Sequence, residues 1–322
     1  MRSWSATVES KSVFVTGGSG FVGRRLVQQL RDDSRAVTVA VRNGSASLTP
    51  PVFQFDGLLA YQDWAEGVVG HDVVIHSAAR VHVMDEQSAE PLAEFRKVNV
   101  DGTLNLARQS AAAGVKRFIF ISSIKVNGEA TLNGKTFFAS DKPVPEDAYG
   151  QSKLEAEQGL IQLAANTGME MVIIRPPLVY GPGVKGNFAS MIKLVEKGLP
   201  LPLGAIHNKR SLIGIDNLVD LIIRCIDHPA AANQVFLAGE GEDLSTTELL
   251  RGVGQAMGKP ARLIPVPAGL LQFGAMLLGK EAMAQRLLGS LQLDISKTCE
   301  LLDWKPPYTV EEGLKRCFER SN

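Results

Sequence analysis

Short apolar runs alternate with longer segments of helical periodicity in the first half of the chain. Five runs rich in valine, isoleucine and phenylalanine are predicted to be strands: residues 12–16, 36–41, 72–76, 117–121 and 169–175. Between them, apolar residues recur at helical spacing over residues 21–31, 93–113 and 148–165. Strands that are apolar throughout are typical of a parallel sheet covered on both faces, so the pattern predicts a doubly wound α/β fold.

The pattern changes after residue 180. Glycine and proline cluster at 181–186, helical periodicity returns at 188–197 and 217–226, a further strand is predicted at 234–238, and helical segments dominate from residue 246. We therefore expect a Rossmann-type domain with a doubly wound parallel sheet over residues 11–180, to which the strand near 234–238 returns. A smaller, mostly helical C-terminal lobe is expected over residues 181–322.

The longest apolar stretch covers residues 266–279 and contains proline, glycine and glutamine. It is too short to cross the roughly 30 Å hydrocarbon core of a bilayer. We therefore expect a buried or groove-lining helix here, and no membrane span. The N-terminal residues lack the apolar core of a secretory signal, and a cytoplasmic protein is expected.

Composition narrows the classes of partner. The 322 residues carry 34 Lys plus Arg and 34 Asp plus Glu, so the formal net charge is zero. This balance provides no broad basic surface for nucleic acid or an anionic membrane, although a local basic pocket is compatible with it. Cys225, Cys299 and Cys317 lie far apart, and the five histidines include no H-E-x-x-H pair. Neither a disulfide framework nor a metal site is therefore predicted.

A glycine-rich segment, TGGSGFVG at 16–23, follows the first strand and opens the first helix. Glycines at such a turn let the chain bend tightly, let its backbone approach a pyrophosphate, and let the helix pack close to the strand. The free N–H groups and the positive dipole end of the helix then favour an anion. Its place in a strand–turn–helix unit predicts dinucleotide binding. The residues predicted to bind are Gly17, Gly20, Phe21, Val22 and Gly23.

The end of the second strand bears on which cofactor binds. NAD-preferring sites place an acid there to bind the ribose 2′-hydroxyl, whereas this chain has Arg42 followed by Asn43. A guanidinium suits bidentate binding of the 2′-phosphate of NADP. NADP(H) is therefore the favoured cofactor and NAD(H) the alternative, since Arg42 could equally be a solvated charge at a strand end.

Tyr149 and Lys153 form a candidate catalytic pair. They are four residues apart in a predicted helix, which puts them on one face. An adjacent ammonium and the positive nicotinamide of an oxidised cofactor would lower the pKa of the phenol. Tyr149 could then move a proton at an alcohol oxygen while hydride is transferred. Ser123 follows the strand 117–121 and could hydrogen-bond the same oxygen. The alternative is an exposed tyrosine with a surface lysine.

In combination, these motifs resemble the extended short-chain dehydrogenases/reductases, and within them the UDP-glucose 4-epimerase group. The matching marks, in chain order, are TGGSGFVG at 16–23, DGL at 56–58, HSAA at 76–79, NVDGT at 99–103, the serines at 122–123, Tyr149 with Lys153, and RPPLVYGPG at 175–183. The resemblance implies a Rossmann-type N-terminal domain, a C-terminal lobe that binds a nucleotide sugar, and a homodimer joined through a four-helix bundle.

Carried over to this chain, the resemblance assigns roles to individual residues. It implies that the adenine is contacted by Asp56 and Leu58, that the backbone of Ala78 and Ala79 lies along the cofactor, and that Asn99 supports this region. Tyr149 and Lys153 would touch the cofactor as well as form the catalytic set with Ser123. The implied substrate-binding residues are Ser123, Asn187, Phe188, Arg210 as the ligand of the diphosphate, and Arg286 as a second candidate.

Departures from the group's pattern bear on the reaction. Asn127 stands where epimerases often carry tyrosine, Leu178 stands where many carry asparagine, and Ile124-Lys125 replaces the Asp-Glu pair of dehydratases. We therefore expect a ketoreductase that acts on a UDP-linked 4-keto sugar of the 6-deoxy-N-acetylhexosamine type in surface-polysaccharide (O-antigen) synthesis. The alternative is a 4-epimerase of UDP-glucose or UDP-N-acetylglucosamine. A third possibility is a non-catalytic protein that senses NADP(H).

Overall fold

The computed structural model describes residues 10–43, 51–81, 90–132 and 134–319. The chain divides into two compact units. The first unit comprises the described residues of Met1–Ile121 together with Glu155–Ile173 and Ile223–Gln234. The second unit comprises Ser122–Leu154, Ile174–Ile222 and the described residues of Val235–Asn322.

A seven-stranded sheet carries the predicted Rossmann-type topology, with strand order β3-β2-β1-β4-β5-β6-β9. The five strands from β3 to β5 pair in parallel. Their bounds are β1 Val13–Thr16, β2 Val37–Arg42, β3 Val52–Phe55, β4 Val73–His76, β5 Arg117–Ile121, β6 Glu170–Arg175 and β9 Gln234–Leu237. Strands β1, β2 and β3 follow one another toward one edge of the sheet, whereas β4, β5 and β6 follow one another toward the other edge. This reversal of strand order between β1 and β4 is typical of doubly wound folds, and the predicted fold class is confirmed.

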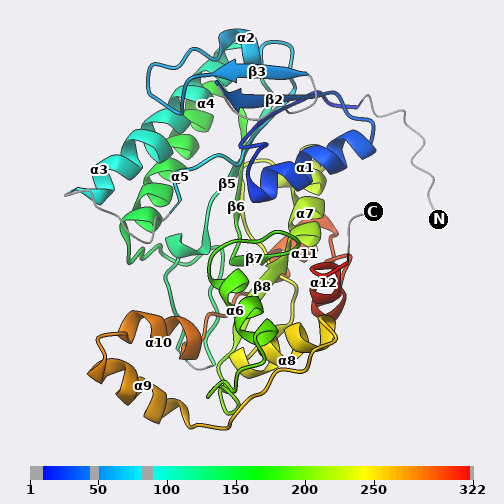
Figure 1. Ribbon diagram of the computed structural model, residues 1–322. Helices are drawn as coiled ribbons and strands as arrows, with labels where there is room; N and C mark the ends of the chain where they lie inside the picture. Colours follow the sequence, from blue (N-terminus) through cyan, green and yellow to red (C-terminus); the bar gives the residue numbers. More distant parts are fainter. Residues whose placement is uncertain (1–9, 44–50, 82–89, 133, 320–322) are drawn as a thin grey trace. The chain divides into compact units, whose positions relative to one another are not determined.

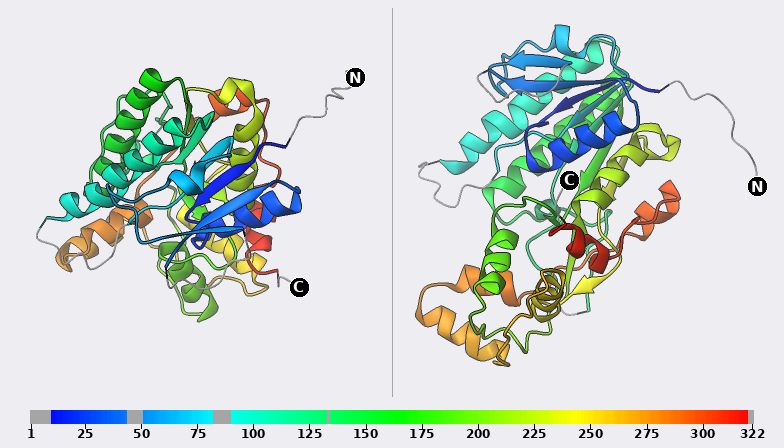
Figure 2. Two further views of the ribbon diagram at one scale, coloured as in Figure 1. Left: turned by 90° about the horizontal axis from the view of Figure 1, so that it is seen from above. Right: turned by 45° about the vertical axis from the view of Figure 1, so that its right-hand side comes forward.

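Helices cover both faces of this sheet (Figure 1, Figure 2). On one face, α1 (Phe21–Asp32) buries Leu26, Val27 and Leu30, whose spacing puts them on one side of the helix. On the other face lie α4 (Thr103–Ala112) and α5 (Ala148–Thr167). These two helices approach closely, because a Cβ at Gly159 would lie 2.8 Å from the Leu104 side chain. The short helix α2 (Ala65–Val68) precedes β4.

The helix predicted over residues 93–113 is divided into three parts. It begins as α3 (Pro91–Phe95), continues as the π-helical segment η1 (Arg96–Gly102), and ends as α4. A π-helical insertion often marks a position where a side chain is needed for a specific contact. Here it contains Asn99, which binds the backbone of Arg80, and Gly102, whose Cβ would lie 2.6 Å from the carbonyl oxygen of Leu58.

The second unit is built on a three-stranded sheet of order β10-β8-β7. Strands β7 (Leu178–Tyr180) and β8 (Arg210–Gly214) pair in parallel, and β10 (Asp243–Leu244) pairs antiparallel with β8. Its remaining elements are η2 Ile124–Val126, α6 Asn187–Glu196, α7 Ile215–Asp227, α8 Thr246–Ala256, α9 Ala268–Leu277, α10 Glu281–Leu288, α11 Ser296–Leu302 and α12 Val310–Arg316. Helix α7 ends in the first unit, which also contains η3 Pro229–Ala231. An apolar core forms where Tyr180 stacks on Phe188 at 5.4 Å between ring centroids.

The apolar stretch at 266–279 contains α9. Of the two settings predicted for this helix, buried or groove-lining, the buried one is wrong. None of its residues is buried, and Leu270, Phe273 and Leu277 are 64%, 58% and 69% exposed. The prediction assumed that a helix with so few polar positions must lie in a core. Within the described part of the chain, no helix is long and apolar enough to cross a membrane.

Candidate active site

The glycine-rich turn joins β1 to α1 and packs against the end of β4. Gly17 has φ +76°, and a Cβ there would lie 2.6 Å from the backbone nitrogen of Ala78. A Cβ at Gly23 would lie 2.1 Å from the carbonyl oxygen of Gly17. Only glycine therefore allows this turn, this helix and the Ala78 backbone to come together. The structure places these three predicted cofactor residues side by side.

The first turn of α1 is open to an anion. Gly20 is the N-cap residue, and it has no side chain to bind the N–H groups of the first turn, which also contains no acidic residue. Those N–H groups include Phe21 and Val22, and they carry the positive end of the helix dipole. A cradle of this kind, which side chains would fill, fits the pyrophosphate of a dinucleotide.

The ends of β2 and β3 meet beside this turn in the sheet. Arg42 pairs in register with Phe55, and both strand ends continue into exposed polar residues. The Asn43 side-chain amide donates to the Asp56 carboxylate at 2.6 Å. An acid therefore does lie at the end of β2, although it is supplied by the neighbouring strand. Leu58, two residues beyond Asp56, is half-buried.

The segment after β4 is fixed by two buried side chains. Asn99 accepts the Arg80 N–H at 2.8 Å and donates to its carbonyl at 3.0 Å, which holds the backbone just after Ala79. His76 is fully buried, and its two ring nitrogens contact the hydroxyls of Thr16 at 2.6 Å and Thr103 at 2.9 Å. These contacts give His76 and Asn99 structural roles. In the described part of the chain, no cluster of His, Cys, Asp or Glu is arranged to hold a metal ion.

Ser123 occupies the turn that follows β5. The backbone N–H of Ser122 donates to the Ile174 carbonyl at 2.8 Å and that of Ile124 to the Pro176 carbonyl at 3.0 Å, so the turn stays bonded to β6 and the residues just after it. Ser123 has an extended backbone and forms the N-cap of η2, where its hydroxyl oxygen accepts the Lys125 N–H at 3.2 Å. A hydroxyl that accepts in this way can still donate its own hydrogen to a ligand oxygen.

Tyr149 and Lys153 lie in the first turns of α5, so they share one face as predicted from their spacing. Tyr149 is half-buried, Lys153 is 2% exposed, and the buried hydroxyl of Ser152 donates to the Tyr149 carbonyl at 2.8 Å. Burial, and then the nearby Asp147 carboxylate, raise the pKa of Tyr149. The lowering of this pKa expected from the adjacent ammonium is therefore not found in the chain by itself, where burial and Asp147 act in the opposite direction.

An ion-pair cluster joins the Ser123 turn to α5. The Lys125 ammonium lies 2.5 Å from Asp147 Oδ2 and 2.6 Å from Glu129 Oε1. Asp147 also accepts the Gly150 N–H at 2.6 Å, and a Cβ at Gly150 would lie 2.7 Å from the Lys125 carbonyl oxygen. Burial alone would raise the pKa of Asp147, but the bonds from Lys125 and Gly150 lower it on balance.

This cluster, which we call the Lys125 clamp (Lys125, Glu129 and Asp147), was not predicted from the sequence. In the sequence, Lys125 is distinctive only as a departure from the dehydratase pattern. A lysine followed 22 residues later by an aspartate has no characteristic spacing, so only the fold could have revealed the pair. The clamp lies two residues from Ser123 on one side and two residues from Tyr149 on the other, and it therefore fixes both turns.

Arg210 begins β8, and its guanidinium donates to the Gly289 carbonyl at 2.9 Å. Burial lowers the pKa of Arg210, whereas the Glu129 carboxylate of the clamp acts in the opposite direction. Gly289 is the C-cap of α10, the helix that carries Arg286 as an exposed side chain. Both predicted diphosphate-binding arginines therefore belong to one region of the second unit.

The other two predicted substrate residues open α6. Asn187 is exposed, whereas the Phe188 side chain is fully buried in the core of the second unit. A ligand contact at position 188 would therefore come from the backbone. The two residues that depart from the epimerase pattern, Asn127 and Leu178, both make contacts inside the protein. Asn127 is 2% exposed, and its side-chain oxygen accepts a hydrogen bond from the Arg175 guanidinium at 2.9 Å. Leu178 packs on the same core as Phe188.

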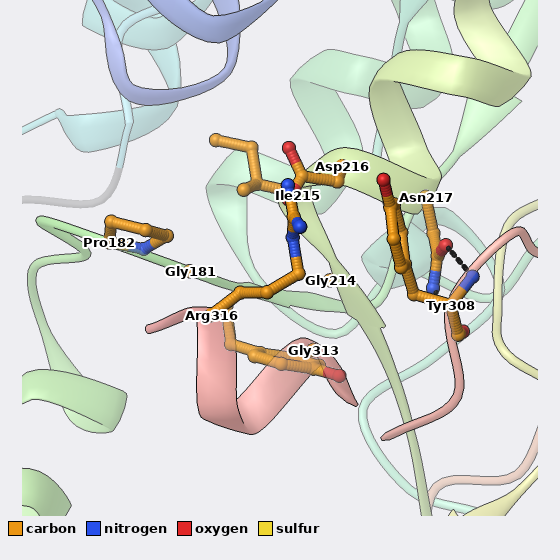
Figure 3. Close-up of a pocket in the computed structure, with 10 residues that line it drawn as sticks. Gly181, Pro182, Gly214, Ile215, Asp216, Asn217, Tyr308, Gly313 and Arg316 are labelled. Carbon is orange, nitrogen blue, oxygen red and sulfur yellow. Dashed lines mark hydrogen bonds and ion pairs between the residues drawn. The ribbon is translucent and has the colours of Figure 1, made fainter. Parts of the chain in front are cut away.

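A separate hollow in the second unit is lined by Tyr180, Gly214, Asn217 and Arg316 among others, and none of the predicted site residues lines it (Figure 3). Three of its lining residues bond to the carboxylate of Glu240. The Glu240 carboxylate accepts from the Tyr180 hydroxyl at 2.9 Å, the Gly214 N–H at 2.9 Å and the Asn217 amide at 2.5 Å. Burial raises the pKa of Glu240 to about 6. These hydrogen bonds hold β7, β8 and α7 together, so the network has a structural role.

Comparison with known proteins places these features in a wider group. Residues 13–239 match the family described as the NAD dependent epimerase/dehydratase family. The chain is 52% identical over 308 residues to a UDP-glucose 4-epimerase of Vibrio cholerae, covering 95% of this chain and 94% of the relative.

Two solved structures share the fold. A UDP-glucose 4-epimerase from Thermotoga maritima, solved with UDP-glucose, superimposes with a TM-score of 0.75 at 24% identity, covering 95% of this chain and 97% of that one. A UDP-glucuronic acid 4-epimerase from Bacillus cereus, in complex with NAD, gives a TM-score of 0.73 at 20% identity, covering 95% of this chain and 96% of that one. At these identities the similarity establishes the fold.

Proposed function

Because this chain belongs to the NAD dependent epimerase/dehydratase family, within the extended short-chain dehydrogenases/reductases that its motifs resemble, we propose that it is a UDP-sugar 4-epimerase that uses NAD(H). The observation that carries the proposal is the 52% identity, over nearly the whole of both chains, to the Vibrio cholerae protein named UDP-glucose 4-epimerase. The chain also retains Ser123, Tyr149 and Lys153, the set that the reaction requires.

The chemistry at carbon 4 of the sugar rests on three side chains. The Tyr149 oxygen takes the proton of the 4-hydroxyl and later returns it, once the sugar presents its other face. Ser123 donates a hydrogen bond to the same oxygen. Lys153, one helical turn from Tyr149, stabilises the phenolate with its positive charge. NAD(H), when bound, supplies the acceptor and donor of hydride at carbon 4.

The cofactor would be held by the first unit. Gly17, Gly20 and Gly23 form the pyrophosphate cradle, with the N–H groups of Phe21 and Val22 directed at the phosphates. Asp56, held by Asn43 at the end of β2, supports NAD(H) over NADP(H), because a carboxylate accepts from a ribose hydroxyl but repels a phosphate. Arg42 remains the argument for NADP(H), and that preference stays a prediction.

The nucleotide sugar would be held by the second unit. Arg210 is proposed as the main diphosphate ligand, since charge-assisted bonds from a half-buried guanidinium are strong. Arg286 is proposed as its partner, and the N-terminus of α6 at Asn187 and the Phe188 backbone as further contacts. In this proposal residues 181–322 serve mainly as the nucleotide-sugar lobe. The homodimer, the cytoplasmic location and a role in O-antigen synthesis stay predictions.

A second candidate function is the 4-ketoreductase expected from the sequence. Asn127, Leu178 and Arg42 favour it, because they depart from the epimerase pattern. The relatives favour the epimerase, and a reductase would use the same Ser123, Tyr149 and Lys153. The two reactions differ in whether reduced cofactor is consumed, so assay rather than geometry separates them.

The test is to incubate the purified protein separately with UDP-glucose and UDP-N-acetylglucosamine, and to analyse the products by NMR. An epimerase forms the galacto epimer of at least one sugar without net change in NADH absorbance. A reductase leaves both sugars unchanged and oxidises reduced cofactor when given a UDP-4-keto-6-deoxy sugar, which would overturn the epimerase proposal.

A further inference from the structure

Helices α9 and α10 contact each other and form a hairpin in the second unit (Figure 1, Figure 2). Apolar side chains of this hairpin are exposed to solvent. Leu270, Phe273, Met276 and Leu277 of α9 are 64%, 58%, 54% and 69% exposed. At 100° per residue these four positions fall within an arc of about 120° on the helix. Leu278 and Met283 extend the patch to the start of α10, at 72% and 57% exposure.

The exposed face belongs to an ordered part of the unit. Before α9, Leu263 and Pro267 form bridges with Leu201 and Ala205. After α10, the Ser290 carbonyl accepts the Thr131 N–H at 2.8 Å, and Leu291 bridges to Arg210. The hairpin is therefore tethered on both sides, and its apolar residues are held outward by the backbone. A contiguous outward patch of this kind marks an interaction surface.

Charge at the edge of the patch indicates the kind of partner. No charged residue lies between Arg262 and Lys280, and both of these side chains are exposed. Along α10, the exposed charges are Glu281 and Arg286. Three of these four exposed charges are cationic, although the whole chain has no net charge. An anionic surface with an apolar interior complements both features.

A second copy of the chain complements these charges less well than an anionic surface does. A two-fold interface would place the patch against itself and bring like cations close together, which costs energy. A span is excluded by length, because ten helical residues cover about 15 Å, half the core of a bilayer. The dimensions and the charges together suit a helix that lies in the plane of the membrane interface.

We propose that the α9–α10 hairpin docks the protein on an anionic lipid bilayer, with the face made by Leu270, Phe273, Met276, Leu277, Leu278 and Met283 inserted among the acyl chains and Lys280 at the headgroups. This inference goes beyond the proposed function and does not depend on which sugar is turned over. The hairpin begins and ends beside segments of the second unit that include Arg210. Docking would therefore hold that arginine's region near the headgroups.

The test is flotation of the full chain with vesicles of equal parts phosphatidylglycerol and phosphatidylcholine, and with vesicles of phosphatidylcholine alone. The wild type is expected to float with the anionic vesicles and at least about tenfold less with the neutral ones. Leu270→Ser/Phe273→Ser/Leu277→Ser should lose about tenfold or more of the anionic binding, and Lys280→Glu should weaken it selectively.

Matched single variants distinguish loss of vesicle binding from misfolding. Leu277→Ser and Val69→Ser remove similarly exposed aliphatic side chains, at 69% and 61% exposure, the first on the patch and the second in the first unit. Only Leu277→Ser should weaken flotation, and both should retain UDP-sugar turnover. Absence of flotation by the wild type, or equal flotation of both variants, would overturn the proposal. So would a halved molar mass of the triple variant in light scattering, because the patch would then bind a second copy.

Discussion

The Lys125 ammonium and the Asp147 carboxylate lie 2.5 Å apart, and this ion pair connects the turn after β5 with the start of α5. Ser123 precedes Lys125 by two residues, and Tyr149 follows Asp147 by two. Gly150 reinforces the connection, because its backbone packs on the Lys125 carbonyl and donates to Asp147. The positions of the Ser123 and Tyr149 hydroxyls therefore depend on the Lys125–Asp147 ion pair, although neither of these two residues belongs to the proposed catalytic set.

Asp147→Asn should shift the pH profile of turnover. The carboxylate raises the pKa of Tyr149, so its loss favours the phenolate. In protein saturated with NAD, the limb of kcat that rises with pH should move to lower pH, while its maximum falls as Lys125 loses its partner. Glu129→Gln is the matched control, since it also removes an acceptor of Lys125 but not the charge beside Tyr149. A limb that stays in place, or moves equally in both variants, would contradict the role given to Asp147.

Gly23→Ala should destabilise the first unit and weaken NAD binding. Its Cβ would meet the Gly17 carbonyl oxygen at 2.1 Å, and overpacking against backbone costs about 1–3 kcal/mol. Gly274→Ala in α9 is the control, because no atom lies within 4 Å of its Cβ and alanine is the better helix former by about 0.5–1 kcal/mol. Urea unfolding and NAD titration measure both effects. Equal stability of the two variants would refute the close packing described for the turn.

Arg210→Ala should weaken the binding of UDP by about 10-fold to 100-fold, the range expected for loss of one charge-assisted contact of about 1.5–3 kcal/mol. Arg286→Ala should have the smaller effect, since that side chain is exposed on α10. Calorimetric titration with UDP compares the two without turnover. If Arg286→Ala proves the more damaging, the diphosphate assignment passes from Arg210 to Arg286.

Glu240 should make stability depend on pH. Its folded pKa of about 6 lies above the ordinary 4.5, so the folded chain holds this proton more tightly than the unfolded chain. The stability it contributes therefore falls as pH rises from about 4.5 to 6, by about 2 kcal/mol, and is constant above.

Glu240→Gln cannot ionise, so the unfolding free energy of the wild type minus that of the variant should decrease across this range. Glu242→Gln, which removes an exposed carboxyl two residues away, is the control. A difference that rises with pH between 4.5 and 6 would contradict the described burial.

Much of the fold could be predicted because its signals are local. The strands β1, β4 and β5 are buried along their whole length, so their sequences are apolar except for one terminal residue each, Thr16, His76 and Arg117. Strands β3 and β8 were not predicted, since VFQF is interrupted by a glutamine and RSLIG begins with polar residues. A buried or groove-lining helix was predicted for α9 and the buried alternative is wrong, because an apolar pattern shows that a face avoids water but not which surface covers it.

The candidate site could likewise be predicted only in part. The glycine turn and the Tyr149–Lys153 pair have fixed spacings that mark them within a few residues. The Asn43–Asp56 bond and the Lys125 clamp join residues that are 13 and 22 positions apart, and no periodicity connects them. Such contacts are set by the order of strands in the sheet, so they become visible only in the folded chain.

In the proposed reaction, carbon 4 of a UDP-sugar is inverted without net redox change, and UDP-glucose carrying deuterium at carbon 4 distinguishes this from a net reduction. We expect UDP-galactose to form in large excess over the protein, with deuterium retained at carbon 4 and no accumulation of NADH. We also expect Tyr149→Phe to slow this conversion by at least about 100-fold while NAD still binds. Deuterium lost from the sugar, or no conversion by a wild type that instead oxidises reduced cofactor with a UDP-4-keto sugar, would contradict the proposed reaction.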